Sequence, residues 1–146
     1  MSTIDRHLDE RLSVKVSDVL HAELRKSVLQ RYAIELELRL ARDIQRGLLP
    51  EQLPWIEGFE IIAFSSPTHF VGGDFYDVIP VADGFVAILG DVSGKGVAAA
   101  LLGSMALGCL ETQLQSNAGL GTAITSLNSL YTKRVLEDSL RCFFFD

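Results

Sequence analysis

The chain has 146 residues, of which 48% are hydrophobic and 22% charged, and its formal net charge is −6. This length and composition are typical of one soluble globular domain with a helical extension. The acidic balance argues against nucleic-acid binding, which needs clustered Lys and Arg. The longest uncharged apolar stretch, residues 96–110, is shorter than the roughly 20 residues of a membrane span, so we expect no membrane association.

The two cysteines, Cys109 and Cys142, are far apart in the sequence and form neither a disulfide framework nor a zinc-binding spacing. No basic-then-apolar signal segment is present at the N-terminus. Both features fit a reducing compartment, and we expect a cytoplasmic protein.

The N-terminal third carries large apolar residues at every fourth position from Leu20 to Leu48, with charged residues between them. This pattern predicts one long amphipathic helix over residues 18–47. Gly47 and Pro50 are expected to terminate it. The first 17 residues are polar and weakly patterned, and we expect there either a frayed start or the remnant of something upstream. The apolar stripe either packs on the helix's own domain or pairs with a second copy in a parallel coiled coil, which would form a homodimer. We divide the chain into a tail and linker or dimerisation helix (1–47) and a domain (48–146).

Downstream of Pro50 the pattern changes to short strands and then two helices. Apolar runs bounded by Gly, Pro and Asp predict strands, and small or apolar residues at helical spacing predict helices. The predicted elements are strands at 59–64, 74–81 and 85–92, helices at 94–114 and 122–136, and a last strand within 141–146. The sequence Ala82-Asp83-Gly84 predicts a hairpin turn between the second and third strands. An apolar strand is a poor last element for a domain, so we expect a truncated domain.

The hairpin brings two aspartates together in most registers. In one register Asp74 lies opposite Asp91, and in another Tyr76 lies opposite Asp91. In both registers the carboxylates of Asp74 and Asp91 share one face of the sheet. A register between these two would place them on opposite faces. Asp77 falls on the other face and is the weaker candidate, and Asp83 is expected to be a turn residue.

The region around these aspartates has no basic side chain between Arg46 and Lys95. Two carboxylates at one sheet edge form a plausible site for Mg²⁺ or Mn²⁺, which prefer oxygen ligands. The backbone carbonyl of Val92 could complete the ligand set. The alternative is that they are surface carboxylates beside ordinary turns.

Directly after Val92, the sequence SGKG opens a helix whose free N–H groups favour an anion such as phosphate. Gly94, Lys95 and Gly96 are therefore candidate phosphate or substrate contacts. His69, in the loop before the site, is a weaker candidate for phosphate binding.

Three segments carry a family resemblance. They are ARDIQRGLLPEQLP (41–54), VGGDFYDVIP (71–80) and LGDVSGKGVAAALL (89–102). In this order and spacing they resemble motifs of the bacterial PPM-type (protein phosphatase type two C-like) serine/threonine phosphatases. The resemblance is to the branch of stage II sporulation protein E and RsbU, and it covers about residues 40–146, roughly the N-terminal half of that catalytic domain.

The resemblance implies an α+β fold, the N-terminal half of an α/β/β/α sandwich of antiparallel sheets preceded by a long amphipathic linker helix. It implies a two-metal Mn²⁺ or Mg²⁺ centre held by Asp74, Asp91 and the Val92 carbonyl, with Asp74 and Asp91 as the catalytic residues. The later aspartates of that centre would follow Asp146, so the centre is expected to be incomplete here. Hydrolysis would proceed by in-line attack of an activated water on phosphorus, without a covalent intermediate.

The resemblance further implies a substrate, the phosphoserine or phosphothreonine of an anti-sigma-factor antagonist of the STAS type, in sigma-factor regulation by partner switching. We expect weak or no activity from these 146 residues alone. The alternative is a catalytically incomplete interaction or regulatory module that binds a partner through the helix and the half-domain.

Overall fold

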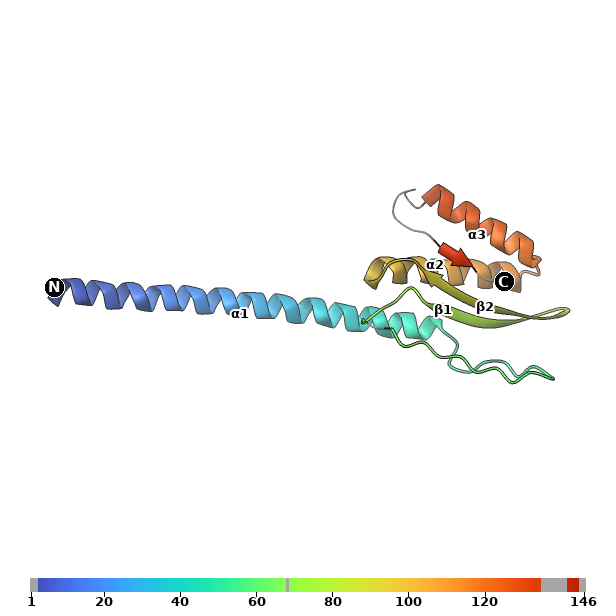
Figure 1. The fold of residues 1–146 in the computed structure, drawn as a ribbon, viewed down its shortest axis with the longest axis horizontal. Coiled ribbons are helices and arrows are strands. Elements are labelled where there is room, and N and C mark those ends of the chain that lie inside the picture. The colour runs from blue at the N-terminus through green and yellow to red at the C-terminus, as the bar shows by residue number, and fades with distance from the viewer. Residues whose placement is uncertain (1–2, 68, 135–141, 145–146) are drawn as a thin grey trace. The chain divides into compact units, whose positions relative to one another are not determined.

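The computed structural model describes residues 3–67, 69–134 and 142–144, and it describes side chains for residues 15–67 and 69–133. The chain forms two compact units, Met1–Arg39 and Leu40–Asp146. Within these ranges, the elements in chain order are α1, β1, β2, α2, α3 and β3 (Figure 1). The mixture of helices with an antiparallel sheet confirms the predicted α+β class.

Helix α1 runs from Thr3 to Leu48, so the predicted helix exists but begins earlier than expected. The expectation of a frayed start is wrong, because residues 3–17 contain no Gly or Pro that would interrupt a helix already formed downstream. The unit Met1–Arg39 consists of this helix. Most of its described large apolar side chains are more than half exposed, including those of Leu20, Leu24 and Tyr32. The domain boundary at 47/48 stays a prediction.

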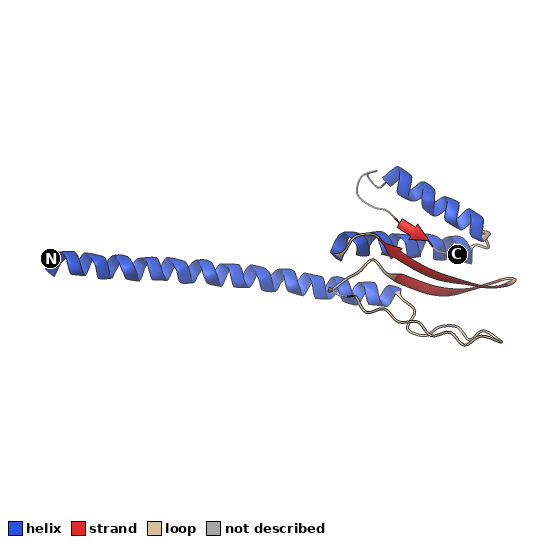
Figure 2. Ribbon diagram, in the orientation of Figure 1, coloured by secondary structure: helices blue, strands red, loops and turns tan. Residues whose placement is uncertain are grey.

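Strands β1 (Phe75–Val81) and β2 (Gly84–Val92) form the predicted antiparallel hairpin (Figure 2). Phe75 pairs with Gly90 and Val81 with Gly84. The turn residue Gly84 has a φ of 145°, a backbone conformation that favours glycine. The third strand, β3 (Cys142–Phe144), pairs with β2, so the strand order of the sheet is β1-β2-β3. The last predicted strand is therefore confirmed.

Helices α2 (Gly96–Gln115) and α3 (Leu120–Arg134) cover the hairpin. Helix α2 packs on both strands, and α3 packs on α2. The core that joins these elements consists of apolar residues from all four of them: Phe75, Ile79, Val92, Ala99, Ala106, Leu107, Leu110, Leu114, Ala123 and Leu127. The hydroxyl of Tyr131 donates a hydrogen bond of 2.7 Å to the carbonyl of Leu102, which ties α3 to α2.

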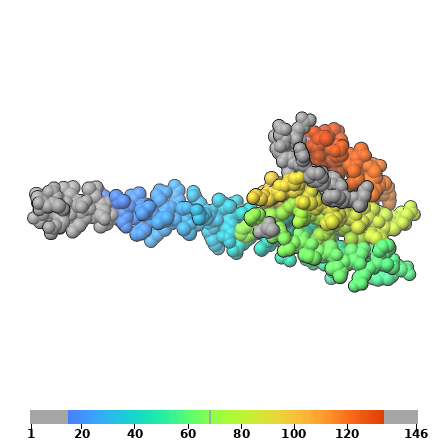
Figure 3. All heavy atoms as spheres, viewed as in Figure 1, coloured from blue at the N-terminus to red at the C-terminus, as the bar shows by residue number. Residues whose placement is uncertain are grey.

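The strand predicted at residues 59–64 is wrong. This segment contains no strand, and its only ladder contact is a single bridge between Ile56 and Phe59. A strand needs a neighbour to satisfy its N–H and C=O groups, and within the described residues no strand lies beside this segment. Ile62 and Phe64 are therefore 83% and 84% exposed. The segment touches the hairpin through Phe59, whose ring meets that of Phe85 edge-on with centroids 5.0 Å apart. Figure 3 shows all atoms of the chain in the same orientation.

Helix α2 is the one helix in the described ranges that is long and apolar enough to cross a membrane by length and composition alone. Its buried residues include Ala99, Ala106 and Leu110, which belong to the core shared with the hairpin. The apolar character of α2 thus has a structural explanation in the packing of the domain.

Candidate functional site

The two aspartates of the predicted metal site come together at one end of the hairpin. Strand β1 begins at Phe75, directly after Asp74, and β2 continues past Gly90 through Asp91 to Val92. Because Phe75 lies opposite Gly90, the same register places Asp74 opposite Asp91, which is the first of the two arrangements expected.

The contact between these carboxyl groups changes their electrostatics. Burial raises the pKa of Asp74 above its ordinary value of 3.8, and the hydrogen bond and negative charge of Asp91 raise this pKa further. Two carboxylates this close repel one another when both are ionised, so one of them retains its proton more readily. Within the residues that the structure describes, neither carboxyl group forms an ion pair with a basic side chain.

Glycines hold the strands and α2 close enough to form this arrangement. A Cβ atom at Gly73 would lie 2.6 Å from the carbonyl oxygen of Val92 and 3.2 Å from the Cβ of Ala99. A Cβ at Gly103 on α2 would lie 2.9 Å from the carbonyl oxygen of Gly73. The backbone of Val92 also donates a hydrogen bond of 3.4 Å to Gly73. The residue before Asp74 is therefore held between β2 and α2 by backbone contacts that only glycine permits.

Helix α2 begins at Gly96, four residues beyond Val92. Gly94 and Gly96 have φ angles of 112° and 70°, which turn the chain from the strand into the helix. Lys95 is the N-cap residue, is exposed and makes no side-chain capping hydrogen bond. The first turn of α2 carries no acidic side chain, so its N–H groups and its positive dipole end face no negative charge of their own helix.

The C-terminal turns of α1, residues 40–48, belong to the same compact unit as the aspartates. The side-chain amide of Gln45 makes two hydrogen bonds to the backbone of Gly72. Its Nε2 donates to the Gly72 carbonyl at 2.7 Å, and its Oε1 accepts from the Gly72 N–H at 3.2 Å. This pair of bonds attaches α1 to the loop that leads into Asp74.

A groove of about 1040 Å³ lies beside this attachment. It is lined by residues from the end of α1, from the extended segment and from the start of β1: Arg42, Asp43, Gln45, Arg46, Gly47, Leu49, Pro50, Glu51, Ala63, Phe64, Ser65, Ser66, Pro67, His69, Phe70, Gly72, Asp74 and Tyr76. Asp74 and His69 therefore border the same groove, which also receives two arginines.

The other candidate residues do not join the pair. The carboxylate of Asp77 accepts a hydrogen bond of 2.7 Å from the N–H of Val78, and Asp83 is exposed in the hairpin turn. In the part of the chain that the structure describes, no group of three or more His, Cys, Asp or Glu is placed to hold a metal ion. Among the described residues, the carboxyl groups that meet at this edge of the sheet are those of Asp74 and Asp91, and their role as metal ligands stays a prediction.

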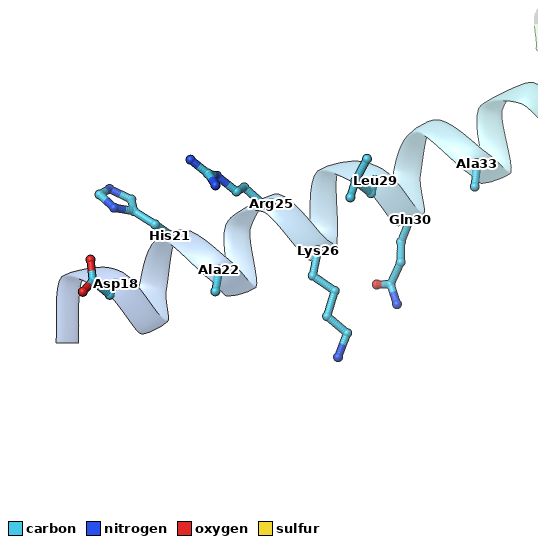
Figure 4. A pocket seen from close by; sticks show the side chains of 8 residues that line it. All are labelled: Asp18, His21, Ala22, Arg25, Lys26, Leu29, Gln30 and Ala33. Carbon is cyan, nitrogen blue, oxygen red and sulfur yellow. The ribbon is translucent and has the colours of Figure 1, made fainter. Parts of the chain in front are cut away.

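A second hollow lies on α1 and is formed by side chains of one helix, among them Asp18, His21 and Arg25 (Figure 4). All the residues that line it belong to this one helix, and no second element encloses a ligand. This hollow is not a candidate active site.

Gln45 and Arg46 also belong to the site, although the sequence alone does not identify them as site residues. Both lie in the segment ARDIQRGLLPEQLP (41–54), which contributes to the family resemblance. A Gln and an Arg beside an apolar stripe are weak evidence for a functional site, because any solvent-exposed helix face carries the same residue types. Only the contact with Gly72 distinguishes them.

Comparisons with known proteins agree with this geometry. The family model of stage II sporulation protein E matches residues 82–146. Protein IcfG of Synechocystis is 45% identical over 67 residues, which are 45% of this chain and 11% of that protein. The phosphoserine phosphatase RsbU of Bacillus subtilis is 28% identical over 102 residues, which are 70% of this chain and 30% of RsbU.

Among solved structures, the SiaA-PP2C domain of Pseudomonas aeruginosa has a similar fold, with a TM-score of 0.56 and 21% sequence identity. The match covers 77% of this chain and 48% of that one. The chain is thus similar to the stage II sporulation protein E family over residues 82–146 and to the phosphatase RsbU over 102 residues, and it shares the fold of a PP2C domain. It spans less than a third of the length of the curated relatives that it matches.

Proposed function

We propose that this chain contributes to a metal-dependent protein phosphatase that hydrolyses phosphoserine or phosphothreonine. The observation that supports the proposal is the hydrogen bond between the carboxyl groups of Asp74 and Asp91, which lie opposite one another at the end of the hairpin. Two carboxylates that repel one another form a site where a divalent cation stabilises the folded chain.

The residues present fit part of a site for Mn²⁺ or Mg²⁺. Such ions take oxygen ligands and retain several waters, so one or two carboxylates are an ordinary protein contribution. Asp74 and Asp91 would supply these oxygens, and the Val92 carbonyl, which lies against Gly73, is a further candidate. When bound, the ion supplies Lewis-acid stabilisation of the negative charge on the phosphoryl group and lowers the pKa of water.

The chain's own residues would then bind and orient the phosphoryl group. The first N–H groups of α2, which begins at Gly96, favour an anion at this end of the helix; Gly94 lies just before it, and the N-cap residue Lys95 adds a positive charge. These contacts would hold the phosphate beside the two carboxylates. Gln45 keeps the loop before Asp74 in position through its two hydrogen bonds to Gly72.

For the substrate we propose a phosphorylated anti-sigma-factor antagonist of the STAS type, in a cytoplasmic partner-switching system. The support is the similarity to RsbU, which is named a phosphoserine phosphatase. We also propose that the exposed apolar stripe of α1 pairs with a second copy of the chain. Its large apolar side chains, such as Val28 and Leu36, are about 60% exposed, so burying them in a coiled coil would be favourable.

The test of the metal site is calorimetric titration of the chain with Mn²⁺. We expect binding by the wild type and loss of binding in Asp91→Asn, whereas Asp83→Asn, which makes the same charge change in the hairpin turn, should bind as the wild type does. Release of phosphate from a phosphoserine protein would be measured in parallel. Absence of binding in the wild type, or equal binding in Asp91→Asn, would remove the metal-site argument.

A second candidate function is a regulatory module that binds a partner without catalysis. It is favoured by the observation that the described residues bring two carboxylates together and no third metal-binding side chain. The two candidates differ in one result: Mn²⁺ binding that is lost in Asp91→Asn supports the phosphatase, and absence of Mn²⁺ binding supports the module.

A further inference from the structure

The end of α1 presents a basic face to the groove beside Asp74. Arg42 and Arg46 are four residues apart and therefore lie on the same side of the helix, next to Gln45. All three line the groove, and Gln45 is bonded to Gly72. The basic face is thus held against the loop that leads into the carboxylate pair.

The two arginines differ in their partners. The guanidinium of Arg42 is paired with the carboxylate of Asp43, with Nη2 and Nε at 3.1 Å and 3.2 Å from the same oxygen. Arg46 makes no ion pair with a carboxylate within the described residues. The groove also contains Glu51, which is exposed and of opposite charge. Arg46 is therefore the cation of this groove whose charge is not engaged by a neighbouring acid.

We propose that this groove binds the phosphorylated segment of a protein substrate, and that the guanidinium of Arg46 pairs with its phosphate. The proposal rests on the phosphatase function proposed above and adds a substrate-binding residue to it. A guanidinium can form two parallel hydrogen bonds to a phosphate, an interaction that a serine hydroxyl or a neutral peptide cannot replace.

The size and lining of the groove fit an extended peptide. Its volume of about 1040 Å³ is at the upper end of the roughly 300–1000 Å³ of small-molecule pockets. Ser65, Ser66 and Tyr76 give its walls further polar groups. Asp74 lines the groove, so a peptide bound there would lie next to the carboxylate pair.

The experiment measures the binding of two fluorescein-labelled peptides, about ten residues long, which differ only in the phosphate on one serine. Fluorescence anisotropy is recorded with the full chain in EDTA, so that binding is measured without hydrolysis. The variants are Arg46→Gln, Arg39→Gln and Glu51→Gln. Arg39 is a matched control because it lies on the same helix outside the groove, where it pairs with Glu35 at 2.6 Å.

We expect the wild type to bind the phosphopeptide more tightly than its unphosphorylated twin. Arg46→Gln should weaken phosphopeptide binding about ten-fold, the usual effect of losing a charge-assisted hydrogen bond, and should leave the twin unchanged. Arg39→Gln should bind as the wild type does. Glu51→Gln should tighten phosphopeptide binding, because it removes a negative charge from the groove, and damage to the fold would not produce a gain.

The proposal is overturned if Arg46→Gln binds the phosphopeptide as the wild type does, or if it weakens both peptides equally. A separate titration with Mn²⁺ keeps the two proposals apart. Phosphate-selective binding through Arg46 in a chain that binds no Mn²⁺ would contradict the phosphatase function and leave the groove assignment standing. Mn²⁺ binding that is lost in Asp91→Asn, together with phosphopeptide binding that is unchanged in Arg46→Gln, would contradict the groove assignment alone.

Discussion

Replacing Gly103 by alanine tests the packing that holds the candidate site together. Gly103 lies on the buried side of α2, where a Cβ atom would come within 2.9 Å of the carbonyl oxygen of Gly73 and within 3.3 Å of the Phe75 ring. Gly108 lies on the same helix but is exposed, and a Cβ there would meet nothing within 4 Å. The two glycines therefore form a matched pair for the same substitution.

The expected difference follows from these contacts. In a helix interior, Gly→Ala is stabilising by about 0.5–1 kcal/mol, a gain that both variants share. Gly103→Ala must in addition push α2 away from the loop at Gly73, and forcing extra atoms into a packed core costs about 1–3 kcal/mol. We therefore expect Gly108→Ala to be more stable than the wild type, and the two variants to differ by about 1–3 kcal/mol.

The measurement is urea unfolding of the full chain, followed by far-ultraviolet circular dichroism. With m-values of about 1–3 kcal/mol per molar urea, the midpoints of the two variants should be separated by roughly 1 M. Equal m-values would show that the comparison reflects stability alone. Equal midpoints, or a Gly103→Ala variant more stable than Gly108→Ala, would refute the close contact between α2 and Gly73.

Three further predictions concern the site and α1. In EDTA, the stability that protonated Asp74 contributes should be fully present below about pH 4 and lost as the pH rises through its raised pKa. The urea midpoint of the wild type, measured relative to that of Asp74→Asn, should therefore fall with rising pH. An increase of this difference with pH would contradict the prediction. Gln45→Leu removes both hydrogen bonds to Gly72 and should cost about 1–3 kcal/mol in the same unfolding assay, since a part-buried N–H loses its partner; an unchanged midpoint would show that the contact is dispensable. Leu24→Asp places a charge in the exposed apolar stripe and should abolish self-association in sedimentation equilibrium, whereas a wild type that stays monomeric at all concentrations would contradict dimerisation through α1.

Local pattern in the sequence predicted most of the elements. The helix that ends at Leu48, the hairpin and the two helices that follow were recognisable, because apolar spacing of about four and of two residues reflects which side chains face a core. The same alternation limited the hairpin to a few registers, two of which bring Asp74 and Asp91 together. The sequence also showed that these aspartates lack a basic neighbour along the chain.

The remaining features of the fold depend on contacts between segments that are far apart in the sequence. The register with Phe75 opposite Gly90 depends on the packing of Phe75 under α2, which periodicity alone does not reveal. The segment 59–64 has the composition of a strand but lies beside no strand in the described residues, and pairing is a property of two segments rather than one.

The groove and its arginines were also outside the reach of the sequence. Arg46 precedes Asp74 by many residues, and nothing local indicates that the two border one groove. Their proximity results from the two hydrogen bonds between Gln45 and Gly72, which bring the end of α1 to the loop before β1. The sequence by itself thus determined which residues have the chemistry of the site, whereas the tertiary structure decided which of them meet, because that depends on contacts between segments far apart in the chain.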